Sequence, residues 1–448
     1  MKMFSEPHDV EDYLGVEFEC TCGATHFAPI KAVEIGRDAI NELPKYVTKY
    51  GYLKPYILCD EITYKIAGEK ISFLLSECSI HSTTHILTHT GFDEATLGEI
   101  VVSVPSDADL MIGVGTGSIT DITRYSSFRL GLPCFTVATG APMDGFAASI
   151  GILNVNNMKK TMPAHCTEVI IGDTDILKGA PYRMTVAGFG DLIGKITCLN
   201  DWKLSSIITG ERFCENIYSL VKKCVDDILS RAGRIKEKDP EVLGEVMKGL
   251  VLSGTCISLN GDSRPASGAE HHMSHYWETI KEQRGERAAM HGEQVAVGTV
   301  VVLKLAELLS MCDPDFDSAR QAANTFDQRH WESEIRRAYG TAADEAIELE
   351  RNDGNNCITS RLERINTIEE NWQVIKDILK NLPSSEFLMS LLKDIGCPCT
   401  PEEIGIDKQL LKDAILFSKE TRSRYTIFRL CNDLNLLESF ADKLMSEL

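Results

Sequence analysis

The stretch ADLMIGVGTGSITD, residues 108–121, joins an apolar run to a glycine-rich turn. Residues 108–115 have the composition of a buried strand, and the residues after the glycines are typical of the start of a helix. Because Gly113, Gly115 and Gly117 lack a Cβ atom, backbone N–H groups of such a turn can approach a pyrophosphate. The spacing is not the usual G-x-G-x-x-G fingerprint. By itself, the turn leaves open both dinucleotide binding and a purely geometric use of glycine.

Three more runs in the first half of the chain resemble this strand. They are PYILCD at 55–60, LPCFTVAT at 132–139 and TEVIIGD at 167–173. Helix-length segments separate the first strands, and such alternation is typical of βαβ units on a parallel sheet. We therefore predict an α/β domain with a parallel sheet over residues 1–185.

The pattern changes from about Met184 onward. Apolar residues then recur at spacings of three and four, as in amphipathic helices, and no comparable strand run follows. We expect helical structure throughout residues 407–434 and a solvated helix–loop–helix in the charged stretch at 348–372. The second half is thus predicted to be an all-α domain over residues 186–448.

The charge of the chain limits its partners. The 448 residues include 46 Lys and Arg against 66 Asp and Glu, a formal net charge of −20. Nucleic acids and anionic membranes need basic surfaces, so neither is expected as a partner, whereas a small anionic substrate needs only local positive charge. Residues 1–15 are acidic without an apolar core, so we expect no signal peptide. The fifteen cysteines are then most simply reduced thiols in the cytoplasm.

The stretch SRPASGAEHHMSHYWE, residues 263–278, gathers three of the eleven histidines. On a helix, His271 and His275 share a face, and His272 points about a quarter turn away. A further histidine, His291, opens the run HGEQVAVG. Neutral imidazoles are common ligands of divalent transition metals, so we favour a metal site over a set of hydrogen-bonded histidines.

Two carboxylates are further candidates. Asp191, in GFGDLIGK at 188–195, is a possible metal ligand or a helix N-cap. Asp60 ends a predicted strand, where a carboxylate can bind a ribose hydroxyl pair or cap the following helix. Both alternatives stay open at both positions.

Other His and Cys groups are weaker metal candidates. In HSTTHILTH the histidines repeat every four residues, but the segment has the composition of a strand and the residues leading into it. We therefore do not expect these histidines to bind a metal from one common face. Two cysteine groups lack the paired C-x-x-C spacing of a structural zinc site. The histidine group is His81, His85 and His89, and the two cysteine groups are Cys20, Cys22 and His26, and Cys397 and Cys399.

Five motifs together resemble a known family. GVGTGSITD, VATGAPMDGFAAS, GFGDLIGK, SRPASGAEHHMSH and MHGEQVAVG occur in the order found in sn-glycerol-1-phosphate dehydrogenases, and they are most similar to the bacterial AraM-like branch. This family belongs to a superfamily with glycerol dehydrogenase, iron-containing alcohol dehydrogenases and dehydroquinate synthase. The resemblance implies a Rossmann-like domain followed by a helical domain, as in dehydroquinate synthase.

The resemblance also implies roles for individual residues. Metal ligation would fall to Asp191, His271 and His291, and Asp191 would also contact substrate. His275 and Asp144 would be catalytic residues beside the substrate. The dinucleotide would be bound at Asp60, Gly115, Thr116, Gly117, Ser118, Ile119, Thr139, Gly140, Ala141 and Pro142.

The implied reaction is the reversible reduction of dihydroxyacetone phosphate to sn-glycerol 1-phosphate, a lipid precursor. It would use NADH or NADPH and one divalent metal ion, Zn²⁺, Ni²⁺, Fe²⁺ or Co²⁺, in a homodimer. Arg264 or Lys195 could supply charge for the phosphate, although Arg264 could equally brace its loop. The alternatives are a glycerol dehydrogenase, a dehydroquinate-synthase-like lyase and a non-catalytic nucleotide or metal binder.

The sequence departs from the family pattern near the expected cofactor. Ala-Thr-Gly at 138–140 replaces the usual Pro-Thr-Ala, Ala148 replaces a frequent serine, and Thr116 replaces the middle glycine of the turn. These differences leave the choice between NADH and NADPH open.

Overall fold

The computed structural model describes residues 2–3, 10–89, 93–155 and 158–447. The chain forms two compact units. The first contains Met1–Leu192 and Asn216–Ser263, and the second contains Ile193–Glu215 and Arg264–Leu448. The domain boundary predicted between residues 185 and 186 stays a prediction.

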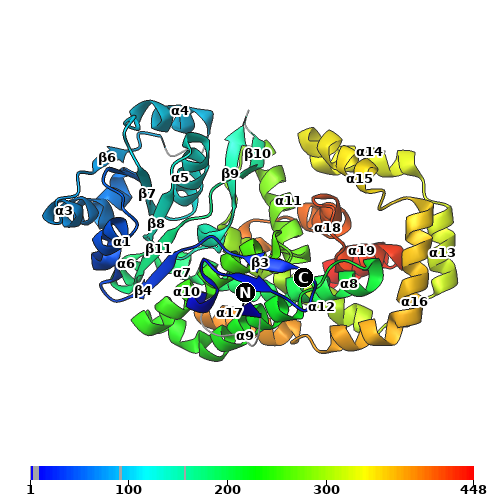
Figure 1. Cartoon of the computed structure of the whole chain (residues 1–448). Helices are drawn as coiled ribbons and strands as arrows, with labels where there is room; N and C mark the ends of the chain where they lie inside the picture. The colour runs from blue at the N-terminus through cyan, green and yellow to red at the C-terminus, as the bar shows by residue number, and fades with distance from the viewer. Residues whose placement is uncertain (1, 4–9, 90–92, 156–157, 448) are drawn as a thin grey trace. The chain divides into compact units, whose positions relative to one another are not determined.

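A six-stranded parallel sheet is the centre of the first unit (Figure 1). The runs predicted as strands all lie in this sheet, and its four central strands are completely buried, which explains their unbroken apolar sequences. The strand order is β4 (Ala32–Gly36), β11 (Val169–Asp173), β8 (Cys134–Ala138), β7 (Leu110–Gly115), β5 (Pro55–Cys59) and β6 (Thr83–Ile86).

Successive residues of the strands pack into different cores on the two faces of the sheet. In β5, Ile57 and Cys59 contact the core that contains α1 (Leu43–Lys49) and α3 (Glu69–Glu77). Tyr56 and Leu58 contact the core formed with α4 (Glu94–Ser103) and α5 (Gly117–Leu130). This alternation follows from the two-residue period of a strand, and the predicted α/β class is confirmed.

The first unit also has two small sheets and further helices. The small sheets are β1 (Lys2–Met3) with β2 (Glu17–Glu19) and β3 (Thr25–Phe27), and β9 (Ile150–Val155) with β10 (Met158–Pro163). The helices are η1 (Val10–Tyr13), η2 (Ala39–Glu42), α2 (Glu61–Thr63), η3 (Tyr64–Gly68), η4 (Gly145–Ala147), α6 (Thr174–Gly179), α7 (Tyr182–Ile193), α9 (Glu215–Arg231), η5 (Ala232–Glu237) and α10 (Pro240–Asn260).

Helix α10 is the one helix of the described chain with the length and hydropathy to cross a membrane. However, 78% of its apolar window is buried, as expected for a core helix of a globular unit. It packs against β4, α6 and η4.

The second unit is helical wherever the structure describes regular elements, as predicted. Its central helix, α12 (His291–Ser310), is buried on nearly all sides, which explains its continuous apolar sequence. The other helices are α8 (Lys195–Thr209), α11 (Ala269–Gln283), α13 (Phe316–Asn324), α14 (Gln328–Tyr339), η6 (Gly340–Ala342), α15 (Ala343–Asp353), α16 (Ile358–Lys380), α17 (Ser385–Ile395), η7 (Glu402–Ile404), α18 (Lys408–Phe417), η8 (Ser418–Glu420), α19 (Ile427–Asp433) and α20 (Leu437–Glu447).

Residues 407–434 are not one continuous helix. The segment divides into α18, η8 and α19. In a continuous helix Glu420 and Arg429 would be separated by about 13.5 Å along the axis. In the structure their side chains form an ion pair of 2.9 Å, and both are buried. The interruption therefore allows buried opposite charges to meet.

The charged stretch at 348–372 forms the predicted pair of helices, but it is not uniformly solvated. Gly354, with φ of 64°, ends α15, and α16 begins at Ile358. Glu350, Arg361 and Arg364 are buried. Arg364 binds Asp433 through two hydrogen bonds of 2.7 and 2.9 Å, so burial is offset by a buried ion pair.

Candidate active site

The predicted cofactor segments lie at one edge of the six-stranded sheet. Asp60 follows β5, residues 115–119 join β7 to α5, and residues 139–142 follow β8. Strand β7 lies between β5 and β8, and the Thr139 N–H donates to the Gly115 carbonyl at 3.1 Å. The carboxyl ends of parallel strands are the usual place for ligands in open α/β sheets. The structure brings these segments together, and their roles in binding stay a prediction.

The glycine-rich turn fits the phosphates of a dinucleotide. A Cβ atom at Gly115 would lie 2.6 Å from the Cβ of Ile119, so glycine is required there. Gly117 has φ of 28°, begins α5 and has open space where a Cβ would lie. The Thr116 hydroxyl oxygen is buried and has no hydrogen-bond partner among the described residues. An orphaned hydroxyl beside a helix N-terminus is suited to an anionic oxygen.

A pocket of about 350 Å³ adjoins the same edge of the sheet. Lys70, Thr139 and Asp173 are among its lining residues. Pockets of this size hold small organic ligands. Thr139 therefore links the pocket to the segment predicted to line the nicotinamide.

Asp60 caps a helix in this structure. Its Oδ1 atom accepts hydrogen bonds from the Thr63 N–H at 2.7 Å and from the Thr63 hydroxyl at 3.0 Å. The Thr63 hydroxyl oxygen in turn accepts from the Asp60 N–H at 3.0 Å, which completes a capping box. The capping alternative is observed, and ribose binding stays a prediction.

Two predicted substrate contacts of the first unit are connected to each other. Asp191 is fully buried in the interior of α7, so it is not a helix N-cap. The Asp144 N–H donates to Asp191 Oδ2 at 2.8 Å, and the Ser253 hydroxyl donates to Asp144 Oδ2 at 2.7 Å. Ser253 on α10 thus orients Asp144, and the Asp144 backbone orients Asp191.

Three histidines of the second unit form a compact cluster. His271 and His275 lie one turn apart on α11, and His291 is the first residue of α12, which packs against α11. The ring centroid of His271 lies 6.3 Å from that of His275 and 5.2 Å from that of His291, and the latter two are 5.7 Å apart. His271 and His275 lie on the same face of α11, as predicted. Metal ligation by Asp191, His271 and His291 stays a prediction.

Glu270 holds His271 in one orientation. Its Oε1 atom lies 2.7 Å from His271 Nδ1, and the carboxylate also accepts from the Thr197 hydroxyl at 2.6 Å and the Gly268 N–H at 2.8 Å. Burial alone would raise the pKa of Glu270, but these contacts lower it below the ordinary value. The carboxylate therefore accepts the Nδ1 proton and leaves His271 Nε2 as the ligand atom.

The role of Glu270 was not expected from the sequence. Adjacent residues of a helix normally point in different directions, so the spacing of residues along the sequence does not predict a contact between Glu270 and His271. Thr197 on α8 is more than seventy positions away in the chain, and only the packing of α8 beside α11 brings it to Glu270.

His275 remains neutral at physiological pH. Burial lowers its pKa to about 4, and the charges of Arg422 and His291 act in the same direction against Glu278. A neutral imidazole can accept a proton or relay one through its two nitrogens. This state is the one required of a proton-transfer group.

Arg422 is a partly buried cation beside the histidines. Burial is the main cause of the lowered pKa values of His272 and His275, and the charge of Arg422 acts in the same direction. Within the described part of the chain, Arg422 forms no ion pair. The two ring nitrogens of buried His272 also have no hydrogen-bond partner there. The charge of Glu345 acts on Arg422 without a direct ion pair, and because a partly buried cation is costly to leave unpaired, this region is suited to an anionic group.

Arg264 has a structural role. Its guanidinium donates to both carboxylate oxygens of Glu211 at 2.6 to 3.0 Å and to the Tyr425 carbonyl at 2.8 Å. Of the two roles considered for Arg264 from the sequence, these contacts support the one in which it braces its loop.

The repeated histidines of HSTTHILTH have a partner of their own. His85 and His89 contact the Glu99 carboxylate at 2.9 and 3.4 Å. The segment includes β6, as expected, and these contacts give no shared metal face. Another candidate group from the sequence, Cys397 and Cys399, is buried, and burial raises the pKa of both thiols.

A parallel α/β sheet with a glycine-rich turn, together with a helical unit carrying paired histidines, defines the class of metal-dependent, nicotinamide-linked dehydrogenases. The family model described as iron-containing alcohol dehydrogenase matches residues 34–181. Glycerol-1-phosphate dehydrogenase (NAD(P)+) of Bacillus licheniformis is 28% identical over 432 residues, 95% of this chain and 94% of the relative. That of Pyrococcus horikoshii is 33% identical over 281 residues, 61% of this chain and 78% of the relative. The chain belongs to the glycerol-1-phosphate dehydrogenase family.

Solved structures agree with this fold. Glycerol dehydrogenase of Schizosaccharomyces pombe has a TM-score of 0.58 at 16% identity, covering 99% of this chain and 94% of that protein. A probable glycerol dehydrogenase of Sinorhizobium meliloti has a TM-score of 0.61 at 14% identity, covering 94% and 99%. At these identities the similarity concerns the fold alone.

Proposed function

We propose that this chain catalyses the reversible NAD(P)H-linked reduction of dihydroxyacetone phosphate to sn-glycerol 1-phosphate. The observation that carries the proposal is the near full-length similarity to curated glycerol-1-phosphate dehydrogenases. The oriented imidazole of His271 and the open turn at Gly117 support it, because they provide what metal and dinucleotide binding require.

Asp191, His271 and His291 would hold one divalent metal ion. Two imidazoles and one carboxylate leave open coordination positions, and they suit Zn²⁺, Ni²⁺, Fe²⁺ or Co²⁺. When bound, the metal would polarise the substrate carbonyl, and the nicotinamide would supply the hydride. Glu270 keeps the His271 Nδ1 proton in place, and the Asp144 N–H restrains the Asp191 carboxylate.

The remaining residues would position substrate and move a proton. His275 is neutral and partly exposed, so its imidazole can relay a proton from water to the reduced oxygen, taking one up at one ring nitrogen as it gives one from the other. The Asp144 carboxylate, oriented by Ser253, would accept a hydrogen bond from the substrate hydroxyl. Arg422 would bind the phosphate, because it is a partly buried cation beside the histidines that forms no direct ion pair among the described residues.

The decisive experiment compares two substrates. Protein stripped of metal and reloaded with Zn²⁺ or Ni²⁺ is assayed for NADH and NADPH oxidation with dihydroxyacetone phosphate and with dihydroxyacetone. We expect metal-dependent turnover of the phosphate ester. His271→Ala should lose both metal and activity, whereas His330→Ala, at an exposed position of α14, should keep both.

The other outcomes contradict the proposal in different ways. Preferred turnover of dihydroxyacetone would indicate a glycerol dehydrogenase. Absence of oxidation with either substrate would favour a lyase or a non-catalytic binder. Full activity of His271→Ala would contradict the ligand assignment.

We also propose that the enzyme acts in the cytoplasm as a homodimer and supplies a precursor of glycerol-based lipids. Fifteen free cysteines in the described structure are compatible with a reducing compartment. Sedimentation of the purified protein at twice the mass of the 49.7 kDa chain would support the dimer, and a monomer mass would contradict it.

A further inference from the structure

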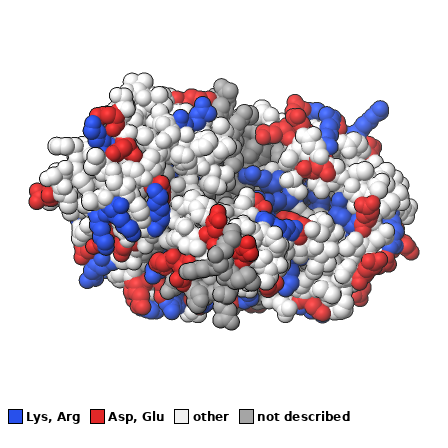
Figure 2. Space-filling model, viewed as in Figure 1, with Lys and Arg blue, Asp and Glu red and all other residues white. Residues whose placement is uncertain are grey.

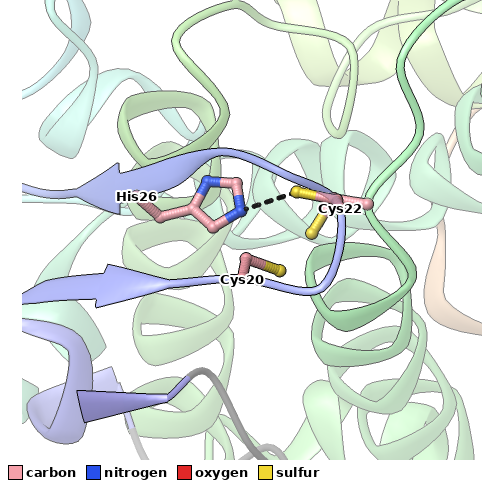
Figure 3. A group of neighbouring side chains, drawn as sticks. Cys20, Cys22 and His26 are labelled. Carbon is pink, nitrogen blue, oxygen red and sulfur yellow. Dashed lines mark hydrogen bonds between the residues drawn. The ribbon is translucent and has the colours of Figure 1, made fainter. Parts of the chain in front are cut away.

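A second group of metal-binding side chains lies in the β2–β3 hairpin. Cys20 and Cys22 are in the turn, and His26 is on β3 (Figure 3). The Cys20 N–H donates to the Ala24 carbonyl at 3.1 Å, and Gly23 has φ of 83°, so the turn is tight. The ligand atoms of the two thiols and the imidazole all lie within 4.8 Å of one another. A single hairpin thus gathers three soft donors, outside the site described above.

The imidazole of His26 is oriented so that its Nε2 atom can bind a metal ion. Its Nδ1 atom lies 2.7 Å from the Leu259 carbonyl of α10. Because a carbonyl can only accept, Nδ1 carries the proton, and the lone pair of Nε2 points toward Cys22 Sγ at 3.3 Å. His26 is 1% exposed, so this orientation is fixed by packing. A backbone carbonyl on the distal ring nitrogen is the usual arrangement behind a metal-bound histidine.

The distances fit zinc. Bond lengths of about 2.3 Å to sulfur and 2.0–2.1 Å to nitrogen place tetrahedral ligands roughly 3.6 Å apart, close to the 3.3 Å between Cys22 Sγ and His26 Nε2. On the other side of the turn, the Asn216 side-chain amide donates to Cys20 Sγ at 3.3 Å and so favours its thiolate.

We propose that Cys20, Cys22 and His26 bind a structural Zn²⁺ ion that ties the β2–β3 hairpin to α10. Two thiolates and one neutral imidazole neutralise the ion, and thiolates select Zn²⁺ over Mg²⁺, Ca²⁺ or Mn²⁺. Structural zinc takes four ligands, of which this hairpin supplies three. Sequence spacing disfavours this site because C-x-C is not the usual C-x-x-C, but the β-turn at Gly23 lets both thiols face His26.

Cobalt loading tests the site in the full-length protein. Chelator-stripped and reduced protein is reloaded with Co²⁺, and its absorption spectrum is recorded. Thiolate coordination produces a charge-transfer band in the near ultraviolet, whereas a site of carboxylate and imidazole ligands produces none. We expect this band in the wild type. Absence of the band in folded, reduced wild-type protein would overturn the proposal without any mutation.

Variants separate this site from the catalytic one. Cys22→Ser should lose the band and one equivalent of zinc, and Cys78→Ser, at an exposed free cysteine, should keep both. His271→Ala should keep the thiolate band even though it loses activity, so failure of the proposed function and failure of this site are distinguishable. A Cys22→Ser protein that retains the band and its zinc content would overturn the assignment.

His26→Cys provides a test that preserves metal binding. A third thiolate in place of the imidazole should retain the ion and intensify the charge-transfer band, because the band reports metal–sulfur bonds. If this variant keeps the wild-type spectrum, His26 is not a ligand.

Discussion

The imidazoles of the active-site cluster differ in their hydrogen bonding, and this difference separates their tasks. His271 Nδ1 is held by Glu270 at 2.7 Å, and His291 Nδ1 lies 3.3 Å from the Ser274 hydroxyl. Glu278 lies 3.8 Å from Nδ1 of both His275 and His291, and among the described residues His275 has no shorter polar contact from its ring. Fixed rings are suited to metal ligation, and the more loosely held ring is suited to moving a proton.

Glu270→Gln should weaken metal binding. The amide can still accept from His271 Nδ1, but it removes the negative charge that makes the ligand nitrogen more basic. We expect metal affinity to fall by about 10- to 100-fold, with folding retained. Metal titration followed by calorimetry measures this change. Glu348→Gln, at an exposed position of α15, is the control, and an affinity equal to that of the wild type would contradict the role of Glu270.

Arg422→Gln should impair use of the phosphorylated substrate selectively. Loss of a charge-assisted hydrogen bond costs about 1.5–3 kcal/mol, so KM for dihydroxyacetone phosphate should rise by roughly 10-fold or more. Any slow turnover of unphosphorylated dihydroxyacetone should be unchanged. Steady-state kinetics with both substrates checks this split. An equal loss with the two substrates would show that Arg422 supports the structure instead of the phosphate.

At the scale of elements, α7 positions the segment after β8. Gly188 faces the backbone of this segment so closely that a Cβ atom there would overlap the Ala141 carbonyl oxygen. The same helix carries Asp191 one turn later. A glycine in α7 therefore sets the distance between a predicted metal ligand and the predicted nicotinamide segment at 139–142.

Gly188→Ala should displace that segment. We expect a loss of about 1–3 kcal/mol in the free energy of unfolding, together with a higher KM for the dinucleotide. Urea denaturation and cofactor kinetics measure the two effects. Gly98→Ala, on α4 with open space around the missing Cβ, should instead be neutral or slightly stabilising. If both variants behave alike, the close approach at Ala141 does not constrain the segment.

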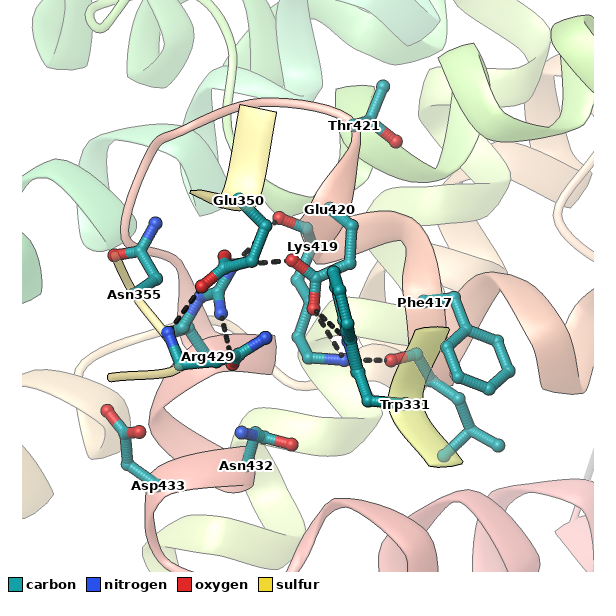
Figure 4. Close-up of polar contacts among 12 residues, drawn as sticks. Trp331, Glu350, Asn355, Phe417, Lys419, Glu420, Thr421, Arg429, Asn432 and Asp433 are labelled. Atoms are coloured by element: carbon teal, nitrogen blue, oxygen red, sulfur yellow. Dashed lines mark hydrogen bonds and ion pairs between the residues drawn. The ribbon is translucent and has the colours of Figure 1, made fainter. Parts of the chain in front are cut away.

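At the scale of the whole molecule, charge is distributed unevenly between surface and interior. Acidic and basic side chains are both spread over the face seen in Figure 2, and the net charge of −20 is a sum over this mixture. Inside the second unit, Glu350, Glu420 and Arg429 are buried together (Figure 4). One guanidinium thus faces two carboxylates, at 2.9 Å from Glu420 and 3.5 Å from Glu350.

Buried Lys419 also pairs with Glu420 at 3.4 Å, and within this cluster the raised pKa of Glu350 makes stability depend on pH. Burial and the Glu420 charge raise the pKa of Glu350 to about 7, against the effect of Arg429. The folded state therefore holds a proton that the unfolded chain releases near its ordinary pKa of 4.5. The stabilisation is complete below pH 4.5 and is lost as the pH rises through about 7.

Glu350→Gln should remove this dependence. Relative to the wild type, the variant should gain on the order of 1–3 kcal/mol in unfolding free energy between pH 5 and pH 8. Urea denaturation at several pH values measures the difference, and Glu348→Gln should retain the wild-type slope. Parallel curves for Glu350→Gln and the wild type would contradict the raised pKa.

The sequence by itself predicted the central parallel strands of the first unit and the helices of the second half of the chain. Buried parallel strands are continuous apolar runs, and amphipathic helices repeat at three and four, so local composition was sufficient for β5, β7, β8 and β11 and for the helical second half. Spacing along α11 likewise placed His271 and His275 on one face. The motifs, through family resemblance, supplied the residue roles.

Only the tertiary structure decided the contacts between distant segments. The helical structure expected throughout 407–434 is interrupted, and the interruption lets Glu420 meet Arg429. The Leu259 carbonyl orients His26 from 233 positions away. Hydrogen bonds and ion pairs depend on where packed elements place individual atoms, and periodicity along the chain carries no information about that placement. For the same reason, only the structure showed that Glu270 and Thr197 support His271. The sequence offered Cys20, Cys22 and His26 as a weak metal candidate, and the structure showed that their ligand atoms lie close together.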